Sequence, residues 1–192
     1  MFPKKCYLCS KEGNTLCEGC LSSFERPLDS THHFISSLYS FKDIKVKRVV
    51  HAIKFFHRKD LVDPLSKKLL SLLPTDDAGW VVVPIPAHPL RRISRGYNQS
   101  ELLASAISKE SGIPVKMDIL RKTKYTERQV TAQTKAERLN RQRNSFKVTG
   151  PLPYTNIILI DDVTTTGTTL LEARSCLIKN GASKVLAITV AH

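Results

Sequence analysis

The sequence predicts an α/β protein in which a parallel sheet is flanked by helices and preceded by a small cysteine-rich segment. Short apolar runs at 80–83 and 157–160 alternate with segments of helical spacing, as in sheets built with right-handed crossovers. Two C-x-x-C pairs lie within the first 20 residues. We therefore expect two units, residues 1–30 and residues 31–192.

Composition is that of an ordinary globular protein with a large positive charge. The chain has 192 residues, of which 41% are hydrophobic and 24% charged, and its formal net charge is +13. This excess favours a polyanionic partner, with nucleic acid, anionic lipid and a phosphorylated substrate all eligible. No apolar run is long enough to span a bilayer, and the N-terminus lacks the apolar segment of a signal peptide. We expect a cytosolic protein.

The two C-x-x-C pairs predict a metal site. Each pair can present two thiolates to one ion, and four thiolates in a tetrahedron are typical of structural zinc. A segment this short buries little core, so metal binding would supply most of its folding energy. Two disulfides or a redox pair are the alternatives. The candidate zinc ligands are Cys6, Cys9, Cys17 and Cys20. Cys176 is interpreted as a packed core residue.

The region before the first long aliphatic run is interpreted as a linker, a strand and two helices. Residues 25–30 are polar, residues 33–41 contain strand formers, and residues 44–56 and 61–73 have helical spacing, with Pro74 ending the second helix. His51 and His57 are six residues apart and do not share a helical face, which argues against a metal pair. Lys54 could reach a phosphate, but its position favours a solvated surface.

A basic segment follows the strand at 80–83. Prolines stiffen the turn, and arginines at 91, 92 and 95 can pair with phosphate oxygens through their planar guanidinium groups. The alternative is a solvated basic turn. Asn98 then begins a helix that ends at Gly112, and Asn98 is either its cap or a ligand contact.

A third strand is predicted over 115–120, and a long basic arm follows it. Residues 116–147 contain ten Lys or Arg against three Asp or Glu, and a polar connection of this length is functional or mobile. The arm could follow a nucleic-acid backbone, with a solvated helix over 134–143 as the alternative. The candidate DNA contacts are Arg121, Lys122, Lys124, Arg128, Arg138, Arg141 and Arg143.

The stretch 156–170 carries the most specific signal. An aliphatic strand ends in Asp161 and Asp162, and a threonine-rich turn around Gly167 leads into a helix over 168–180, followed by a final strand over 184–190. Hydroxyls, backbone amides and a helix N-terminus suit a phosphate, and two carboxylates suit vicinal hydroxyls and Mg²⁺. A ribose phosphate is indicated, unless the threonines only cap the helix. The candidate contacts are Asp161, Asp162, Val163, Thr164, Thr165, Thr166, Gly167, Thr168 and Thr169.

The run I-D-D-V-T-T-T-G-T-T resembles the phosphoribosyl pyrophosphate (PRPP) loop of type I phosphoribosyltransferases. The resemblance implies that fold, Mg²⁺ bound together with PRPP, and a flexible loop that closes over the ligand in the region of the basic arm. It also implies that the loop after an earlier strand holds the pyrophosphate. The matching candidates here are Pro86, Ala87, His88, Arg91, Arg92 and Arg95.

Together with the cysteine pairs, the segment V-P-I-P-A-H-P-L-R-R-I-S-R-G-Y-N-Q resembles the ComF family of competence proteins. The resemblance implies a role in natural transformation at the cytoplasmic face of the inner membrane. There the protein would help single-stranded DNA to enter, alongside a ComFA-like helicase. Two other hypotheses stay open: an active phosphoribosyltransferase for an unidentified base or amine, and a sensor that binds PRPP without turnover. No general base is evident, so the catalytic residues are unknown.

Overall fold

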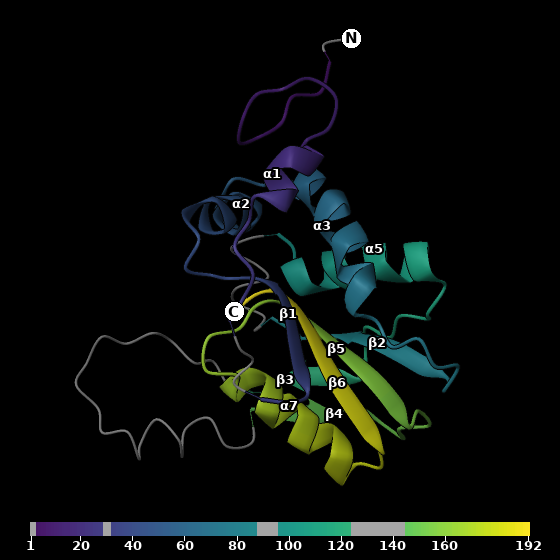
Figure 1. The fold of residues 1–192 in the computed structure, drawn as a ribbon. Helices are drawn as coiled ribbons and strands as arrows, with labels where there is room; N and C mark the ends of the chain where they lie inside the picture. The colour runs from purple at the N-terminus through teal and green to yellow at the C-terminus, as the bar shows by residue number, and fades with distance from the viewer. Residues whose placement is uncertain (1–2, 29–31, 88–95, 124–144) are drawn as a thin grey trace, which may run out of the picture.

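A four-stranded parallel sheet forms the centre of the protein (Figure 1). The computed structural model describes residues 3–28, 32–87, 96–123 and 145–192. The strand order is β1-β6-β5-β2, which confirms the predicted parallel sheet. The strands are β1 (Ile35–Tyr39), β2 (Trp80–Pro84), β5 (Asn156–Val163) and β6 (Lys184–Ala191).

Strand β5 lies between β2 and β6 and is buried on both faces, as its aliphatic run predicts. Successive side chains alternate between the faces, so Ile158 and Ile160 join one core while Ile157 and Leu159 join the other. All four are fully buried. The strand is thereby held firmly, and the two aspartates at its end occupy a defined place.

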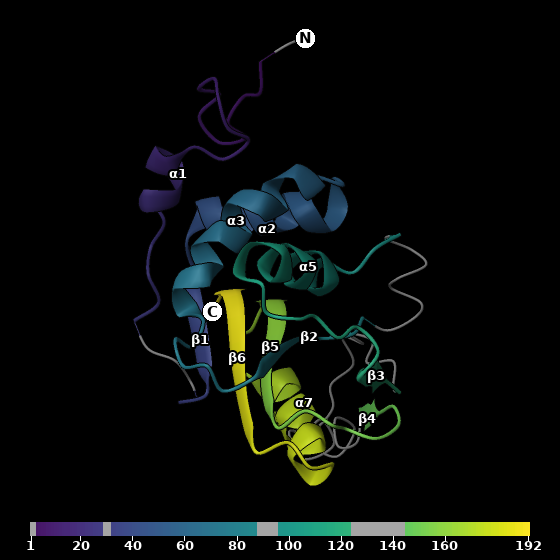
Figure 2. The ribbon, with the colours of Figure 1, turned by 90° about the vertical axis from the view of Figure 1, so that its right-hand side faces the viewer.

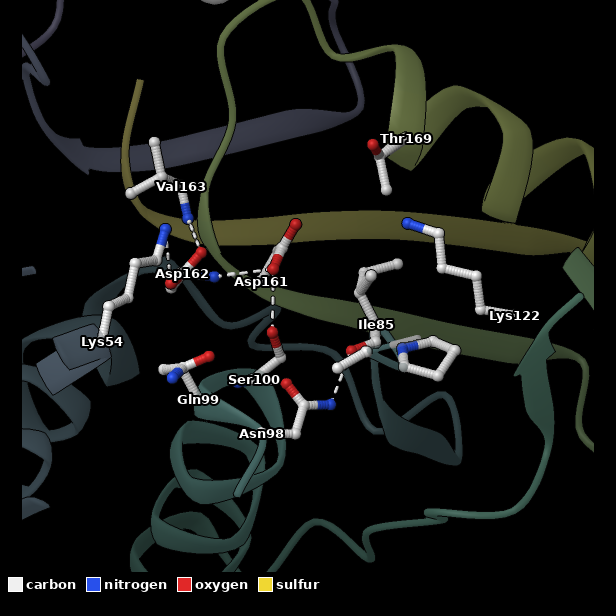
Figure 3. Close-up of a pocket in the computed structure, with 12 residues that line it drawn as sticks. Lys54, Ile85, Asn98, Gln99, Ser100, Lys122, Asp161, Asp162, Val163 and Thr169 are labelled. Carbon is white, nitrogen blue, oxygen red and sulfur yellow. Dashed lines mark hydrogen bonds and ion pairs between the residues drawn. The ribbon is translucent and has the colours of Figure 1, made fainter. Parts of the chain in front are cut away.

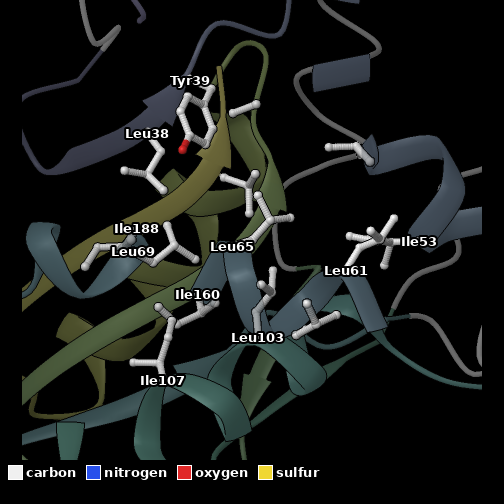
Figure 4. Packing of buried hydrophobic residues seen from close by; sticks show 14 of the residues in the cluster. Leu38, Tyr39, Ile53, Leu61, Leu65, Leu69, Leu103, Ile107, Ile160 and Ile188 are labelled. Carbon is white, nitrogen blue, oxygen red and sulfur yellow. The ribbon is translucent and has the colours of Figure 1, made fainter. Parts of the chain in front are cut away.

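Three helices pack on one face of the sheet (Figures 1 and 2). They are α2 (Ile44–Phe55), α3 (Val62–Leu69) and α5 (Gln99–Ser111). Leu65, Leu103 and Ile107 from α3 and α5 meet Ile160 and Ile188 from the sheet (Figure 4). Short 3₁₀ turns, η1 (Lys59–Leu61) and η2 (Leu70–Leu72), flank α3. The α-helix predicted over 61–73 is therefore shorter than expected.

The opposite face is covered by α7 (Thr168–Lys179) and a two-stranded hairpin. The hairpin pairs β3 (Leu120–Lys122) with β4 (Phe146–Val148) in antiparallel register. The strand predicted over 115–120 is wrong. Only Val115 forms a bridge, to Val82, and the chain then leaves the sheet. Leu120 instead packs with Phe146 on the α7 side, a partner that local alternation cannot indicate.

The cysteine-rich segment packs against the helical layer. It contains the short helix α1 (Glu18–Ser22), and Leu16, Leu21 and Phe24 are buried in the same core as α2 and α3. The Thr15 hydroxyl also donates a hydrogen bond to the Asp60 carbonyl at 2.9 Å. The boundary at residue 30 stays a prediction, and residues 29–31 lie outside the described part. No helix in the described ranges is long and apolar enough to cross a membrane.

Candidate functional site

A cavity of about 210 Å³ lies at the carboxyl ends of β2 and β5 (Figure 3). This is the edge at which open parallel sheets bind their ligands. The α2 helix, the N-terminal turn of α5, the β3 strand and the start of α7 each contribute to it. The lining residues are Lys54, Ile85, Pro86, Ala87, Asn98, Gln99, Ser100, Lys122, Asp161, Asp162, Val163 and Thr169.

The two aspartates at the end of β5 face different partners. Asp161 Oδ1 accepts a hydrogen bond from the Ser100 hydroxyl at 2.8 Å and another from the Asp162 amide at 2.9 Å. Asp162 Oδ1 accepts from the Val163 amide at 2.7 Å. The backbone of β5 and the Ser100 hydroxyl of α5 therefore orient the carboxylates. The cavity between the sheet and α5 stays open (Figure 3).

The environment of Asp161 favours its protonated form. Burial, followed by the negative charge of neighbouring Asp162, raises the pKa of Asp161 to about 7. The Ser100 hydroxyl and the Lys54 ammonium act in the opposite direction and only partly offset this. The cavity thus contains a carboxyl group that exchanges its proton near neutral pH.

Lys54 is a site residue that the sequence interpretation placed on a solvated surface, and the structure corrects this. Its ammonium lies 2.9 Å from Asp162 Oδ2, and only 23% of its side chain is exposed. Lys54 follows Val50 by one helical turn, next to the buried face of α2. A lysine next to the buried face of a helix can reach a neighbouring element, and this spacing was visible in the sequence. Only the packing of α2 beside β5 shows that its partner is Asp162.

The threonine-rich turn divides between the cavity and other surroundings. Thr169 lines the cavity, whereas Thr164 is buried and its amide donates to the Ala191 carbonyl at 3.0 Å. The hydroxyls of Thr166 and Thr168 lie 2.8 Å apart on the surface. Gly167 precedes α7 with φ of 72°, and no side chain caps this helix end. The first amides of α7 have no acceptor within the helix, as an anion site requires.

The start of α5 contributes three residues to the cavity, of which only the first, Asn98, was considered as a ligand contact from the sequence. Asn98 is the helix cap, because its side-chain oxygen accepts from the Ser100 amide at 3.2 Å and its Nδ2 donates to Ile85 at 2.9 Å. Gln99 and Ser100 were not singled out, yet both line the cavity. Gln99 Nε2 is buried and has no hydrogen-bond partner among the described residues. A polar ligand could satisfy this donor.

The structure describes only part of the two basic segments. Pro86 and Ala87 line the cavity, whereas His88, Arg91, Arg92 and Arg95 lie outside the described residues. Arg121 is exposed on β3, and Lys122 lines the same cavity as Thr169 (Figure 3). Lys122 is therefore better placed to bind a phosphate in the cavity than to contact a DNA strand on the surface. The remaining arm candidates, Lys124, Arg128, Arg138, Arg141 and Arg143, are outside the described ranges.

The four N-terminal cysteines converge as their spacing predicts. The sulfurs of Cys6, Cys9, Cys17 and Cys20 all lie within 4.8 Å of one another, and all five cysteines of the chain are free thiols. The Cys6–Cys20 and Cys9–Cys17 sulfur pairs are separated by 3.8 and 3.6 Å. A tetrahedral ion with bonds of about 2.3 Å would place its sulfurs at roughly this separation. The cluster fits a structural metal.

Ionisation of the cluster is uneven. Burial opposes ionisation of Cys6, but backbone hydrogen bonds from Cys17, Cys9 and Leu8 outweigh it and lower its pKa to about 6. The pKa of Cys20 is raised, first by burial and then by its sulfur neighbours. A bound cation would stabilise thiolates at both positions, because it supplies the positive charge that offsets theirs.

Comparison with known proteins matches the C-terminal half of the chain, which supplies most of the residues that line the cavity. Residues 96–192 match the family model of the phosphoribosyl transferase domain. Competence protein F of Haemophilus influenzae is 34% identical over 109 residues, covering 54% of this chain and 46% of that protein. Competence protein ComFC of Bacillus subtilis is 31% identical over 157 residues, covering 80% and 62%.

DNA utilization protein YhgH of Escherichia coli K12 is 28% identical over 143 residues, covering 71% of this chain and 63% of its own length. The chain therefore spans about half to three fifths of the curated relatives named here. Among solved structures, glutamine PRPP amidotransferase from B. subtilis, complexed with ADP and GMP, is 21% identical. That match has a TM-score of 0.46 and covers 72% of this chain and 30% of the solved chain.

Proposed function

This chain belongs to the phosphoribosyl transferase domain family and, within it, to the ComF family, and on that premise we propose a two-part function. It binds PRPP with Mg²⁺ in the cavity at the end of β5, and it handles single-stranded DNA during uptake across the inner membrane in natural transformation. The observation that carries the proposal is the convergence of the aspartate pair, the start of α7 and Lys122 on one cavity.

Each part of PRPP has a matching group in this cavity. Asp161 and Asp162 would hold the ribose hydroxyls and Mg²⁺, because carboxylate oxygens are the ligands that both prefer. The amides and hydroxyls of residues 165–169 would bind the 5′-phosphate, whereas the amide of Thr164, also a candidate, is already bonded to the Ala191 carbonyl. The loop that begins at Pro86 and Ala87 would bind the pyrophosphate. Bound Mg²⁺ would neutralise phosphate charge. With Asp162 bound to Mg²⁺, Lys54 would pair with a phosphate oxygen in place of this carboxylate.

Calorimetric titration with PRPP and Mg²⁺ tests the first part of the function. Wild-type protein is expected to bind, and Asp161→Asn and Asp162→Asn are expected to weaken binding at least tenfold, since a charge-assisted contact contributes on the order of 1.5–3 kcal/mol. Asp63→Asn, on α3 outside this cavity, is the matched control and is expected to bind as wild type. Unchanged affinity in both site variants would reject the assignment.

The DNA part of the proposal is supported by the relatives and by charge. Those relatives carry the names competence protein and DNA utilization protein, and the formal net charge of +13 suits a polyanion. The expected partner in the membrane machinery is a ComFA-like helicase. Fluorescence anisotropy with a labelled single-stranded oligonucleotide is expected to show binding that weakens steeply with salt. Charge reversal at Arg121, Lys124 and Arg128 is expected to reduce both the affinity and the salt slope.

An active phosphoribosyltransferase is the second candidate function. The match of residues 96–192 to the phosphoribosyl transferase domain and the cavity that this part helps to line favour it. Incubation with labelled PRPP and a panel of bases and amines, with pyrophosphate release as the readout, separates turnover from binding. Release that depends on one acceptor and disappears in Asp161→Asn supports turnover. Tight binding without release supports a sensor.

A further inference from the structure

The exposed face of α2 and its C-cap carry large apolar side chains that are at least half exposed. Ile44, Phe55 and Phe56 are 68%, 50% and 64% exposed, whereas Val46, Val49, Val50 and Ile53 on the other face are buried. Scattered exposed apolar residues need no explanation, but these share one side of a helix and its end. Exposed apolar side chains on one side of a helix suggest an interaction surface.

The side chains form a regular stripe. Ile44, Arg48, His51 and Phe55 follow one another at spacings of four, three and four residues, so they lie along one line of the helix. The His51 ring centre is 4.4 Å from that of Phe55 and 6.0 Å from that of Phe56. At ~1.5 Å per residue the stripe is roughly 16 Å long, comparable to four or five stacked nucleotides.

Charge around the stripe has one sign. Residues 44–59 contain six Lys or Arg and no Asp or Glu. Lys45 donates to the Ser23 carbonyl, Lys54 pairs with Asp162, and Arg58 pairs with Asp60. The ammonium groups of Lys47 and Lys59 lie over the rings of Phe41 and Tyr97. Lys47 is exposed beside the stripe, and Arg48 is exposed within it. The surface therefore combines flat rings with cationic side chains that can meet phosphates.

We propose that this face of α2 binds single-stranded DNA, with bases stacked on His51, Phe55 and Phe56 and phosphates beside Lys47 and Arg48. This combination of rings and cations is what unpaired strands require, because every base offers a face for stacking and every nucleotide a charge. A purely apolar partner would not require the cations, and duplex DNA would not expose bases to the rings. The proposal rests on the DNA part of the proposed function.

Fluorescence anisotropy with a labelled single-stranded oligonucleotide tests the α2 face. Phe55→Ala and Phe56→Ala are each expected to weaken binding by about fivefold or more, and Arg48→Glu by a similar factor that shrinks with salt. The matched controls are Ile178→Ala, an exposed apolar residue on α7, and Lys179→Glu, both expected to bind as wild type. The altered residues are exposed, and thermal unfolding confirms that each variant is folded.

Photocrosslinking maps the contact independently of affinity. An oligonucleotide containing 5-iodouracil, which reacts with stacked aromatic rings, is expected to crosslink to the tryptic peptide from Phe55 to Arg58. Duplex of the same sequence should compete at least tenfold less well. Crosslinks confined to the basic arm, with unchanged affinity in the Phe55 and Phe56 variants, would overturn the proposal while leaving the DNA function intact.

Two further outcomes separate this proposal from the function on which it rests. If the wild-type protein binds no single-stranded DNA at any salt concentration, the DNA function fails, whereas PRPP titration still reports on the cavity. If the Phe55 and Phe56 variants bind DNA normally but no longer bind vesicles that contain anionic lipid, the α2 face is a membrane surface and the DNA site is wrong. Single-stranded RNA bound more tightly than DNA would also reject the assignment.

Discussion

At the scale of single residues, two adjacent carboxyl groups have different surroundings. Asp162 is paired with Lys54 at 2.9 Å, whereas Asp161 accepts neutral hydrogen bonds and carries a raised pKa of about 7. In the free protein Asp161 therefore retains its proton about half of the time at neutral pH. Binding a divalent cation would favour loss of the remaining proton.

The affinity for PRPP with Mg²⁺ is expected to rise with pH through about 7, because the ligand requires the ionised form of Asp161. Well below this value the affinity should fall about tenfold per pH unit. Calorimetry between pH 5.5 and 8.5 measures the profile. The pH profile of Asp161→Asn contains only the titration of the PRPP phosphates, so the step near pH 7 should be absent. In Lys54→Met the step should move to higher pH, because Lys54 lowers the pKa of Asp161.

The same pKa predicts an effect of Asp161 on stability. Its pKa is raised above the ordinary value of 3.8, so the folded state retains a proton that the unfolded chain releases between pH 4 and 7. The stabilising contribution is complete below pH 4 and is lost as pH rises through 7. Asp161→Asn should therefore raise the free energy of unfolding by roughly 1–3 kcal/mol at pH 8, with little change at pH 4. Denaturant titration at both pH values measures this, and equal effects at both would contradict it.

At the scale of elements, the turn before α7 depends on one glycine. Gly167 has φ of 72°, and a Cβ built there would lie 2.6 Å from the His32 ring and 3.1 Å from Ile35. The positive φ favours glycine because other residues rarely adopt it. The short distances leave no room for a side chain, because the turn packs closely on β1. A side chain at this position would press against His32 and strain the turn that leads into α7, whose first amides are proposed to hold a phosphate.

Gly167→Ala is expected to destabilise the protein more than Gly150→Ala does. Both positions have nearly the same φ, 72° and 77°, but a Cβ at Gly150 would meet nothing within 4 Å. Both variants therefore share a backbone cost of about 1–2 kcal/mol, and Gly167→Ala adds about 1–3 kcal/mol for the contact with His32. Denaturant unfolding measures the difference. The double variant with His32→Ala should recover part of it, and no recovery would show that the contact is unimportant.

At the scale of the whole molecule, the cysteine cluster and the cavity are linked through one helical layer. Leu16, Leu21 and Phe24 from the cluster segment share a core with α2 and α3, and α2 supplies Lys54 to the cavity. A metal bound by the four cysteines would hold this segment in place and so support the layer above the sheet. The metal site is thus expected to contribute to the stability of the fold rather than to chemistry in the cavity.

Removal of the metal is expected to lower the thermal midpoint and release the N-terminal segment. We predict one zinc per chain by mass spectrometry, and loss of that zinc in Cys9→Ser or after treatment with a strong chelator. Each ~1 kcal/mol lost should lower Tm by about 2–4 °C. Cys176→Ser, on α7, is the control and should retain the metal. Hydrogen exchange should show lost protection in residues 6–24, and unchanged protection after zinc loss would contradict a structural role.

Much of the fold follows from local patterns. The strand at 157–160, the helices that begin at Ile44 and Gln99, and the convergence of the cysteines agree with the expectations from spacing and capping. The strand over 115–120 does not, because alternation of Val115, Met117 and Ile119 indicates a half-buried segment without naming its partner. Hairpin β3–β4 was missed for the same reason, since its two strands are separated by the long basic arm.

The sequence by itself determined the character of each piece: a buried strand ending in two acids, a hydroxyl-rich turn before a helix, and four thiols at metal spacing. These depend on neighbours within a few residues, whose geometry the backbone period sets. Only the tertiary structure decided that Lys54, Ser100 and Lys122 meet Asp161 and Asp162 in one cavity. They come from three separate elements, and contacts between distant elements are decided by how whole faces pack, which no local period encodes.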